Sequence, residues 1–453
     1  MLIKSRRQFL KTGVTTVGAL GALGTIGKLS ELTAFASGAS PYQALVCIFL
    51  GGGNDGHHLV VPLDNQRYAD YAAGRQSLAI PQALLLPIQD GGLSYGLNPN
   101  MPEIQALYNA GNAAIVANVG MLVQPTTKQI FQSNDLSKLP AQLFSHSDQT
   151  SQWQSAIPNS TSPTGWAGRV EDYLLAQYNS NAALSPVTAT TGCGLFCTGQ
   201  QTYAATVPVG GVSLLIGATS ASRLQAVQQL MAFDNGLRLV QAANAQFGRG
   251  VGFSNALNAA LATAHVTTPF PNSLLGQQLQ TVAKIMSIRA ALGINRQVFF
   301  CQLGGFDTHG SQAGQLDVLL QQLSQALGQF YVALQEVGTD TCTVTFTASE
   351  FGRTLQPNGN LGTDHGWGSH HLVIAKNANQ GGPLTGGRMY GQFPQLALGG
   401  SDDANTRGTL VPTTSVDQYS ATMAQWFGVS AANLTSIFPY VGNFPTADLG
   451  FLS

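Results

Sequence analysis

Charged side chains are scarce in this sequence. Only 9% of its 453 residues are Asp, Glu, Lys or Arg, whereas 44% are hydrophobic. This composition is typical of a globular chain with a polar, weakly charged surface, and it excludes disorder of the highly charged kind. Because ionisable groups are few, any place where carboxylates and imidazoles gather requires an explanation.

Cysteine is also rare, which limits the kinds of site that the chain can form. Cys47, Cys301 and Cys342 lie in segments predicted to be buried strands, where a free thiol behaves as a small apolar residue. Cys193 and Cys197 are close together in a loop and could form a disulfide bond in an oxidising compartment. A zinc ribbon needs a second such pair, and haem attachment needs its own cysteine motif. The sequence has neither. Because it also lacks clustered cysteines and the Gly-x-Gly-x-x-Gly turn of dinucleotide-binding proteins, a redox enzyme, suggested only by the export signal, is the weakest functional hypothesis.

Residues 1–36 are predicted to be a twin-arginine export signal. Ser5–Lys11 reads Ser-Arg-Arg-Gln-Phe-Leu-Lys, a weakly apolar stretch follows over Thr12–Ile26, and Ala34–Ala36 offers small residues at a cleavage site. A membrane anchor is the alternative, but the stretch is short and rich in glycine, and no later segment reaches the length of a membrane span. We expect the twin-arginine translocase to export the folded protein to the periplasm or the medium.

Removal of this signal changes the charge balance. It takes five of the 20 basic residues and one of the 21 acidic residues, which leaves 15 and 20 and a net charge of −5. This charge argues against a nucleic-acid partner, which would need a basic face. Cargo of this export route crosses the membrane already folded, often with a metal or cofactor in place, so the signal is also a hint of a metal.

Continuous apolar runs and helical stripes predict the fold. Leucines and other apolar residues recur at steps of three and four over Leu275–Met286 and Leu316–Leu334, which predicts two helices. Strands that alternate with long helices predict a layered α/β fold with a mainly parallel sheet. The apolar runs that predict its buried strands are Ala44–Leu50, Ala113–Val119, Val298–Leu303, Thr343–Ala348 and Leu372–Ala375.

The core is predicted to come from two parts of the chain, 41–178 and 271–453. Residues 179–270 are rich in Ala, Gln, Asn, Ser and Thr and poor in motifs. We interpret them as an inserted helical or mixed subdomain, which could cap a site. In open α/β sheets, ligands gather beyond the carboxyl ends of the strands, and the polar motifs of this chain follow its predicted strands.

The first such motif is Gly51-Gly52-Gly53-Asn54-Asp55. Three glycines allow a sharp turn and a close approach of the backbone to a ligand, and Asn54 and Asp55 offer oxygens at the sheet edge. The same residues suit an Asx-type turn between a strand and a helix equally well. The loop lacks the Gly-Lys-Ser/Thr ending of a phosphate-binding loop.

The second motif places Asp307 and His309 after a predicted strand. Because the two residues are two apart, their side chains point the same way at an extended strand end. A carboxylate and an imidazole on one side suit a divalent ion. The alternative, Asp307 as a helix cap with a solvated His309, is less favoured because histidine is scarce here.

Two further motifs lie between the predicted strands Thr343–Ala348 and Leu372–Ala375. Glu350 could ligate a metal and Arg353 could clamp an anionic oxygen, although an ion pair between them would explain this motif taken alone. In the second, Asp364 is expected to orient His365 as a metal ligand.

Serines precede a predicted helix in the last cluster, Phe144–Gln149. Ser145 or Ser147 could be an activated nucleophile near a metal, but a serine that caps the helix is a strong alternative. The first motif continues to His57 and His58, and the motif with Asp364 continues to His370 and His371. Of the eight histidines, only His265 therefore lies outside these five clusters. That concentration predicts one divalent-metal site assembled from several loops.

The order of these motifs resembles an exported bacterial family known as domain-of-unknown-function family 1501. The resemblance covers essentially the whole mature chain. That family resembles a distant branch of the alkaline phosphatase and sulfatase superfamily, which implies a large mixed sheet between helical layers. The motifs that carry the resemblance are Arg-Arg-x-Phe-Leu, Gly-Gly-Asn-Asp-Gly, Ser-His-Ser-Asp, Phe-Asp-Thr-His, Ser-Glu-Phe-Gly-Arg-Thr and Gly-Thr-Asp-His-Gly.

The resemblance implies roles for single residues. Asp55 matches a metal-binding Asp after the first strand, Asp307 and His309 resemble an Asp and a His on one metal, and His365 resembles the final metal-binding His. The nearest matches to the nucleophile that opens a helix are Ser145 and Ser147.

The sequence also departs from the superfamily pattern. Glu350-Phe351 stands where an Asp-His pair is expected, so one imidazole is missing. No Cys/Ser-x-Pro-x-Arg sequence is present, which argues against sulfatase chemistry based on formylglycine.

Together these observations predict a periplasmic or secreted, metal-dependent hydrolase of phosphate or sulfate esters. Asn54 and Arg353 would stabilise charge on the ester oxygens, and Ser147 or Ser145 would attack if catalysis is covalent. The substrate would be a small anionic ester or a decorated polysaccharide. The predicted ligands of a zinc, calcium, magnesium or manganese ion are Asp55, Asp307, His309, Glu350 and His365.

A second hypothesis is a non-catalytic exported protein of the same fold. It would keep the metal and bind an envelope partner or a polysaccharide, and the polar, weakly charged segment 179–270 would fit this role.

Overall fold

β1 (Gln43–Gly51) is the central strand of the core. Its parallel neighbours are β8 (Arg296–Gly304) and β9 (Thr343–Ala348). Every residue from Ala44 to Leu50 is buried. A strand with neighbours on both edges and helices on both faces has no polar side, which explains why its apolar run is continuous rather than alternating.

The structure is a computed structural model that describes residues 41–159, 161–180, 182, 184–192, 194–210, 220–233 and 236–453. The predicted export signal, residues 1–36, lies outside the described residues, as does Cys193. All described residues except Pro41 belong to one compact unit, Tyr42–Ser453.

The main sheet has nine strands in the order β11-β5-β10-β9-β1-β8-β6-β7, with β12 paired to β5. β10 is antiparallel to both of its neighbours, whereas the other described pairs of this sheet are parallel. The prediction of a large mixed, mainly parallel sheet is therefore confirmed. Its remaining strands are β5 (Ala113–Gly120), β6 (Val187–Ala189), β7 (Ala205–Thr206), β10 (Ser369–Ile374), β11 (Met389–Tyr390) and β12 (Thr414–Ser415).

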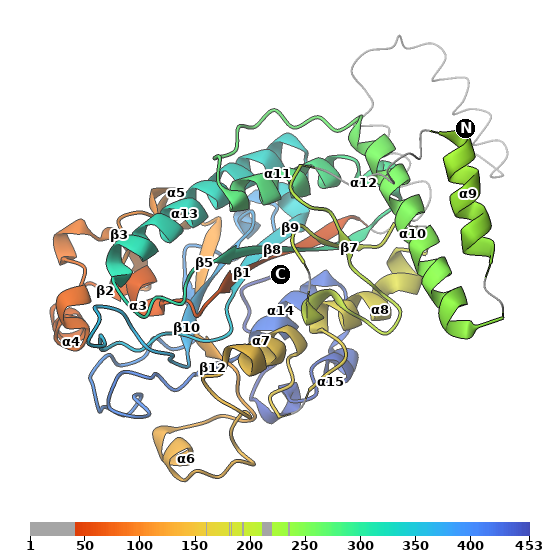
Figure 1. Cartoon of the computed structure of the whole chain (residues 1–453). Coiled ribbons are helices and arrows are strands. Elements are labelled where there is room, and N and C mark those ends of the chain that lie inside the picture. Colours follow the sequence, from red (N-terminus) through yellow and green to blue (C-terminus); the bar gives the residue numbers. More distant parts are fainter. Residues whose placement is uncertain are drawn as a thin grey trace, which may run out of the picture. The chain divides into compact units, whose positions relative to one another are not determined.

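Helical layers cover both faces of this sheet (Figure 1). Val46 and Ile48 of β1 pack into one apolar cluster, and Cys47 and Phe49 pack into the other, because successive side chains of a strand point to opposite faces. The first layer contains α5 (Pro102–Asn109), α11 (Leu274–Ser287), α12 (Arg289–Leu292) and α13 (Gln312–Glu336). The second contains α7 (His146–Ser155), α8 (Trp166–Tyr178), α14 (Val416–Phe427) and α15 (Leu434–Ile437).

Shorter elements surround this core. A second sheet has the strand order β2-β4-β3 and is antiparallel. These strands and the short helices near them are β2 (Val60–Pro62), β3 (Leu86–Asp90), β4 (Leu93–Leu97), α3 (Gly56–Leu59), α4 (Asn65–Arg75) and α6 (Lys128–Gln132).

Part of the segment 179–270 belongs to the main sheet. β6 pairs with β8, and β7 extends the sheet beyond β6. α9 (Ala221–Ala232) and α10 (Arg238–Leu261) follow, and Leu257 of α10 is buried in the core. The idea that this segment caps a site stays a prediction.

The long helices are amphipathic. α13 buries the predicted stripe that includes Leu316, Leu323 and Leu327, while Val318 and Val332 are exposed. In the described part of the chain, no helix is both long and apolar enough to cross a membrane.

The cysteines lie close to their predicted positions, with one correction. Cys47 and Cys301 are free and buried in β1 and β8, as predicted. Cys342 is free but only half-buried, because it ends a short 3-10 helix just before β9 rather than lying in the strand. Cys197 is disulfide-bonded.

Strand polarity brings three loops to one edge of the sheet. β1 and β8 end in register at the pair Gly51 and Gly304, and β9 ends beside them. Because β10 is antiparallel, its first residue, Ser369, lies at this same edge, opposite Val119 near the end of β5. The loop after β1, the loop after β8 and the long loop between β9 and β10 therefore meet, and they carry the predicted motifs around Asp55, Asp307, Glu350 and His365.

The fold also contains a carboxyl group that makes its stability depend on pH. Burial raises the pKa of Asp417, at the start of α14, to about 8, and the charge of Arg169 offsets only part of this effect. Because the pKa of Asp417 is higher in the folded than in the unfolded protein, its contribution to the free energy of unfolding is fully present below about pH 4. That contribution is lost as the pH rises towards 8, by up to about 1.4 kcal/mol per pH unit. We expect Asp417→Asn to flatten this decline when urea unfolding is compared at several pH values. An unchanged slope would contradict the prediction.

Candidate metal site

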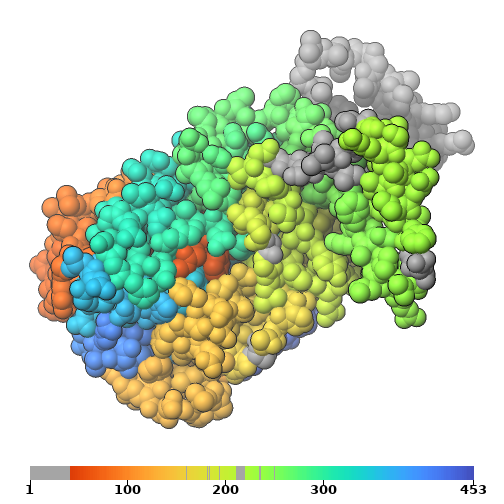
Figure 2. Space-filling model, viewed as in Figure 1, coloured from red at the N-terminus to blue at the C-terminus, as the bar shows by residue number. Residues whose placement is uncertain are grey.

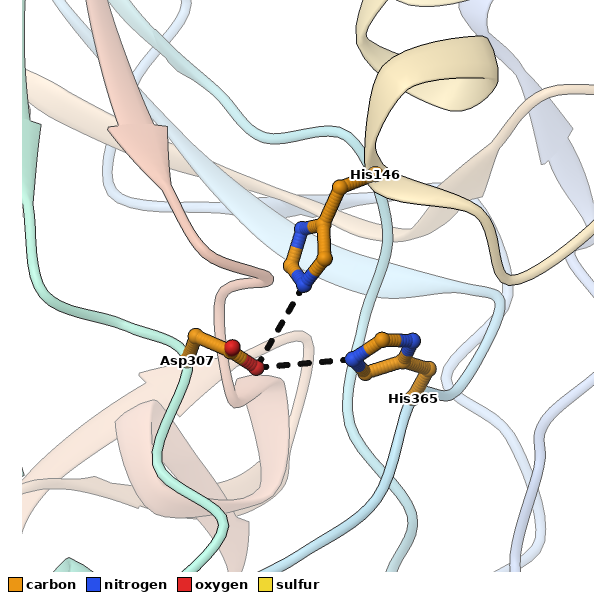
Figure 3. A group of neighbouring side chains, drawn as sticks. All are labelled: His146, Asp307 and His365. Atoms are coloured by element: carbon orange, nitrogen blue, oxygen red, sulfur yellow. Dashed lines mark ion pairs between the residues drawn. The ribbon is translucent and has the colours of Figure 1, made fainter.

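Asp307 stands at the centre of the candidate site. Its Oδ1 atom lies 3.4 Å from His146 Nε2, 3.0 Å from His309 Nε2 and 3.4 Å from His365 Nε2. Figure 3 shows the rings of His146 and His365 pointing at this oxygen. The Nε2 atoms of His309 and His365 are 3.1 Å apart. Three imidazole nitrogens therefore converge on one carboxylate oxygen.

Each of these residues is positioned at the sheet edge. Asp307 and His309 follow β8, and His365 precedes β10. His146 is the first residue of α7, whose N-cap, Ser145, has extended backbone angles and accepts a hydrogen bond from the amide of the helix's first turn. This cap fixes where the helix begins and so fixes His146 at its start.

Two of the rings are oriented through their second nitrogen. His146 Nδ1 lies 2.9 Å from Glu350 Oε1, and His365 Nδ1 lies 2.7 Å from the carbonyl oxygen of Phe144. Because each of these partners accepts a hydrogen bond, they assign the proton to Nδ1 and leave the Nε2 lone pair facing Asp307. Metal-binding histidines are held in this way.

The backbone is strained at Phe144, whose carbonyl oxygen contacts His365. Phe144 has φ 72°, a left-handed conformation that is costly for an aromatic residue. The Gln149 side chain accepts from its amide at 2.6 Å, which holds the turn in place. Its carbonyl oxygen then meets His365, so the strain is found where it orients a site residue.

Asp364 orients a different histidine from the one predicted. Its Oδ1 lies 3.4 Å from His309 Nδ1, and Arg407 and Asn358 hold its carboxylate. The sequence assigned it to the adjacent His365, but the Nδ1 atom of His365 meets the carbonyl oxygen of Phe144 instead.

The distances fit ligands of a single divalent ion. Two ligands at 2.0–2.1 Å from a tetrahedral ion lie about 3.3 Å apart, close to the separations of 3.0–3.4 Å around Asp307 Oδ1. His146, Asp307 and His365 each offer one atom within 4.8 Å of the others. Moreover, His146 Nε2 is buried and has no hydrogen-bond partner among the described residues. An ion bound there would relieve this unpaired nitrogen.

Arg353 holds Asp307 from the protein interior. Its Nη1 donates to Asp307 Oδ1 at 2.9 Å, while Nε and Nη2 donate to the hydroxyl and carbonyl oxygens of Thr363. Burial raises the pKa of Asp307, but the hydrogen bond and charge of Arg353 lower it by more. Asp307 is therefore a carboxylate at neutral pH, as a metal ligand must be.

Phe351 packs against two of the imidazoles. Its ring centroid lies 4.8 Å from that of His146 and 4.6 Å from that of His365. This apolar ring restricts the movement of both imidazoles.

Glu350 lies behind the cluster. Its Oε1 atom accepts from the Gly52 amide at 2.8 Å and also meets His146 Nδ1. Gly52 has φ 120°, and a Cβ atom there would lie 2.3 Å from the Asp307 amide nitrogen, so only glycine allows this close approach. These contacts favour Glu350 as the residue that orients His146, and its role as a direct ligand stays a prediction.

Asp55 is occupied elsewhere. Its Oδ1 accepts from the amides of His57 and His58 as the N-cap of α3, and its Oδ2 accepts from Arg75 and from Gln312 at 2.6 Å. Burial raises the pKa of Asp55, but the charge of Arg75 outweighs this effect and the pKa is about 2. Because both oxygens already have donors, we leave Asp55 out of the ligand set that we propose.

Asn54 is similarly bound into the interior. Its amide nitrogen donates to Ser369 Oγ at 3.2 Å and to the carbonyl oxygen of His370 at 2.9 Å, and its backbone amide donates to Ser349. Asn54 is buried, so these contacts tie the loop after β1 to the beginning of β10.

The two candidate nucleophiles share one carboxylate. Ser145 Oγ lies 2.5 Å and Ser147 Oγ lies 3.2 Å from Asp148 Oδ2, and the two hydroxyl oxygens are 3.2 Å apart. Ser145 is half-buried as the helix cap, whereas Ser147 is exposed. Their catalytic roles stay predictions.

Four histidines of the predicted clusters are packed into the interior instead. Burial lowers the pKa of His57 to about 4 and that of His370 and His371 to about 3, so these rings are neutral. His370 Nδ1 accepts from the Asn118 amide at 3.0 Å. His58 is also buried. The histidines near the strand ends therefore form two groups: some surround Asp307 in the candidate metal site, and the others are packed in the interior.

Sequence reasoning missed His146 as a candidate ligand. The prediction for its cluster names only Ser145 and Ser147, as candidate nucleophiles. The available signal was the Ser145 cap, which places the next residue at the start of a helix, together with the scarcity of histidine.

A cavity adjoins the cluster. Its volume is about 360 Å³, and it lies between α7 and the ends of β1 and β8. Glu350 is in its wall and also contacts His146. In Figure 2, red atoms from the β1 region are visible in a hollow between gold and green-blue segments.

The fold and the cluster define an α/β protein with a candidate metal site at the edge of its sheet. Residues 42–436 match a family described as "Protein of unknown function (DUF1501)". The chain belongs to this family. No curated protein matches the sequence.

Several solved structures are similar over most of the chain. The PsFucS1 sulfatase from Pseudoalteromonas sp. is 10% identical, with 82% of this chain and 68% of that chain covered and a TM-score of 0.32. The C-terminal periplasmic domain of EcEptC from Escherichia coli, in complex with Zn, is 9% identical, with 76% and 75% covered and a TM-score of 0.33. The lipoteichoic acid synthase LtaP from Listeria monocytogenes is 7% identical, with 85% and 80% covered and a TM-score of 0.32.

We expect His146→Ala to weaken metal binding. The change removes one converging nitrogen, and loss of even an outer-shell partner of a metal ligand typically costs about 10–100-fold in affinity. Elemental analysis of the purified protein and titration with Zn²⁺ would measure the effect. His265→Ala, at an exposed histidine outside the site, is the matched control. Equal metal content in both variants would exclude His146 from the site.

We expect Asp55→Asn to lower stability without removing the metal. It would leave the buried Arg75 without its counter-ion, and breaking a buried pair in this way costs about 3–5 kcal/mol. Denaturant unfolding and elemental analysis of the same samples would separate the two roles. Loss of the ion from a variant of normal stability would instead make Asp55 a ligand.

Proposed function

We propose that this protein is an exported, metal-dependent hydrolase of phosphate or sulfate esters. The observation that carries the proposal is the convergence of three imidazole nitrogens on one ionised carboxylate, beside a cavity. Export by the twin-arginine route, to the periplasm or beyond, is part of the proposal and rests on residues 1–36.

The residues that would hold the ion are His146, Asp307 and His365, together with His309. A set rich in imidazole suits zinc better than calcium or magnesium, which prefer oxygen ligands. A divalent ion bound there supplies Lewis acidity to an ester oxygen and lowers the pKa of an attacking hydroxyl or water.

Arg353 has a positioning role in this proposal. Its guanidinium is fully buried, and its nitrogens donate to Asp307, Thr363 and the Gly52 carbonyl oxygen. It would hold the carboxylate in place and add positive charge beneath the site, where an anionic ester group is stabilised. Asn54 would act further away, by fixing the loop that carries Gly52.

Ser147 is the residue that we propose as the nucleophile if catalysis is covalent. It is exposed and one residue from His146, and Asp148 Oδ2 is in position to accept its proton. In the alternative, a water attacks directly and the serines only shape the start of α7. Mass spectrometry of an acid-quenched reaction would detect a phosphoryl or sulfuryl group on Ser147 in the first case alone.

We expect the metal-loaded protein to hydrolyse at least one of 4-nitrophenyl phosphate, a 4-nitrophenyl phosphonate ester and 4-nitrophenyl sulfate. Asp307→Asn should lower kcat/KM by at least about 100-fold, since it removes the charged ligand of the ion. Asp448→Asn, at an exposed carboxylate near the C-terminus, is the control.

Failure of the loaded protein on all three ester classes would contradict the proposal. If the ion is nevertheless bound, that outcome would favour the second hypothesis, an exported protein of this fold that binds an envelope partner or a polysaccharide without chemistry.

A further inference from the structure

The cavity beside the cluster is built from the sheet and one helix. Phe49 of β1 and Phe300 and Gln302 of β8 line it from the sheet. All three lie on the face that α7 covers, since Phe49 pairs with Gln302 in the parallel register and Phe300 is two residues earlier. Thr150 and Gln154 of α7 line the opposite wall.

The helix connects the cavity to the metal cluster. His146, Thr150 and Gln154 are spaced four residues apart, so they lie along one face of α7. At 1.5 Å per residue, Thr150 is about 6 Å and Gln154 about 12 Å further along the axis than His146. Glu350 closes the connection, because it lines the cavity and contacts His146 Nδ1. The cavity therefore lies beside the residue that orients His146.

The polar groups of the cavity wall are free to bind a ligand. Gln154 uses its Oε1 to accept from the Phe196 amide at 3.1 Å. Its Nε2, the Gln302 side-chain amide and the Thr150 hydroxyl have no hydrogen-bond partner in the part of the chain that the structure describes. Two amides and a hydroxyl thus face a space of about 360 Å³, at the small end of the usual range for ligand pockets, about 300–1,000 Å³.

The charge of the wall restricts what can enter. Glu350 is its one ionisable side chain among the lining residues, and no Lys or Arg lines the cavity. A second anionic group on a ligand would meet a carboxylate and no cation, at a cost in a partly desolvated space. Phe49 and Phe300 add an apolar part to the wall beside the amides and the hydroxyl.

We propose that this cavity binds an uncharged, hydroxyl-rich ring of the monosaccharide class and selects against acidic ones. Hydroxyl groups match the free amide and hydroxyl groups, and the C–H face of such a ring matches Phe49 and Phe300. The inference deepens the proposed function, on which it rests for its second half: the ring is the alcohol part of the ester, and the anionic part lies at the cluster. Thr150, Gln154 and Gln302 are then specificity-determining residues.

The test is a binding experiment that needs no turnover. The full folded protein, with and without Zn²⁺, is titrated with methyl β-D-glucopyranoside and methyl β-D-galactopyranoside, and binding is followed by saturation-transfer NMR and calorimetry. Methyl β-D-glucuronide supplies the acidic comparison, and 4-nitrophenol supplies an aromatic alcohol. We expect at least one neutral glycoside to bind in both metal states, and the glucuronide to bind at least about tenfold more weakly because of Glu350.

Two variants place the binding in the cavity. Thr150→Phe fills the space and should weaken glycoside binding by at least about tenfold, because a close-packed wall cannot give way without strain. Thr263→Phe, at an exposed threonine after α10, is the matched control for the added ring. Gln302→Glu adds a second carboxylate and should weaken binding of the glucuronide further relative to the neutral glycosides. This variant tests the location of the binding site if Thr150→Phe does not fold.

The outcomes separate this inference from the proposed function. The inference is overturned if no neutral glycoside binds, if 4-nitrophenol is the one probe that binds, or if the glucuronide binds as tightly as the neutral glycosides. It is also overturned if Thr150→Phe binds glycosides like the parent. These outcomes count even when aryl esters are hydrolysed. Glycoside binding with no hydrolysis of any ester would uphold the cavity as a saccharide site and contradict the hydrolase proposal instead.

Discussion

The contact between Asp307 and the buried Arg353 is the constraint on which the site depends. A carboxylate that is nearly half exposed would ordinarily rotate in solvent, but the guanidinium fixes one oxygen and keeps the group ionised. The nitrogens of three histidines from separate segments then meet that one oxygen. Without a fixed acceptor, the imidazoles would have no common point, and the cluster would be only a group of half-exposed side chains.

The imidazoles are held in place by groups that lie behind them, outside the cluster itself. Glu350, the Phe144 carbonyl group and the Phe351 ring orient His146 and His365. Glu350 and Phe351 are neighbours in the loop after β9, whereas Phe144 lies just before α7. A sheet edge suits this purpose because parallel strands end at the same level. The antiparallel strand β10 begins at that level, so the loop between β9 and β10 also stays at the edge. The same edge leaves space under α7, so the cluster and the cavity share a helix.

Much of the fold could be predicted from the sequence, because local pattern and buried position coincide there. Continuous apolar runs mark β1, β8 and β9, since strands covered on both faces have no polar side. The site was predicted only in part. Asp307, His309 and His365 were expected to meet and do so, whereas Asp55 has both oxygens occupied by Arg75, Gln312 and backbone amides, and Glu350 stands behind a histidine.

By itself, the sequence determined which segments become strands and that their polar ends gather at one edge, because strand formation depends on apolar runs that are local in the chain. Only the tertiary structure decided which side chains keep a lone pair free for an ion. Asp55 and Asp307 each follow a strand and look alike in the sequence, but Arg75 and Gln312 satisfy the first, while Arg353 leaves the second open to His146. Those partners are 20 to 257 residues away from Asp55 along the chain, so no local pattern records them.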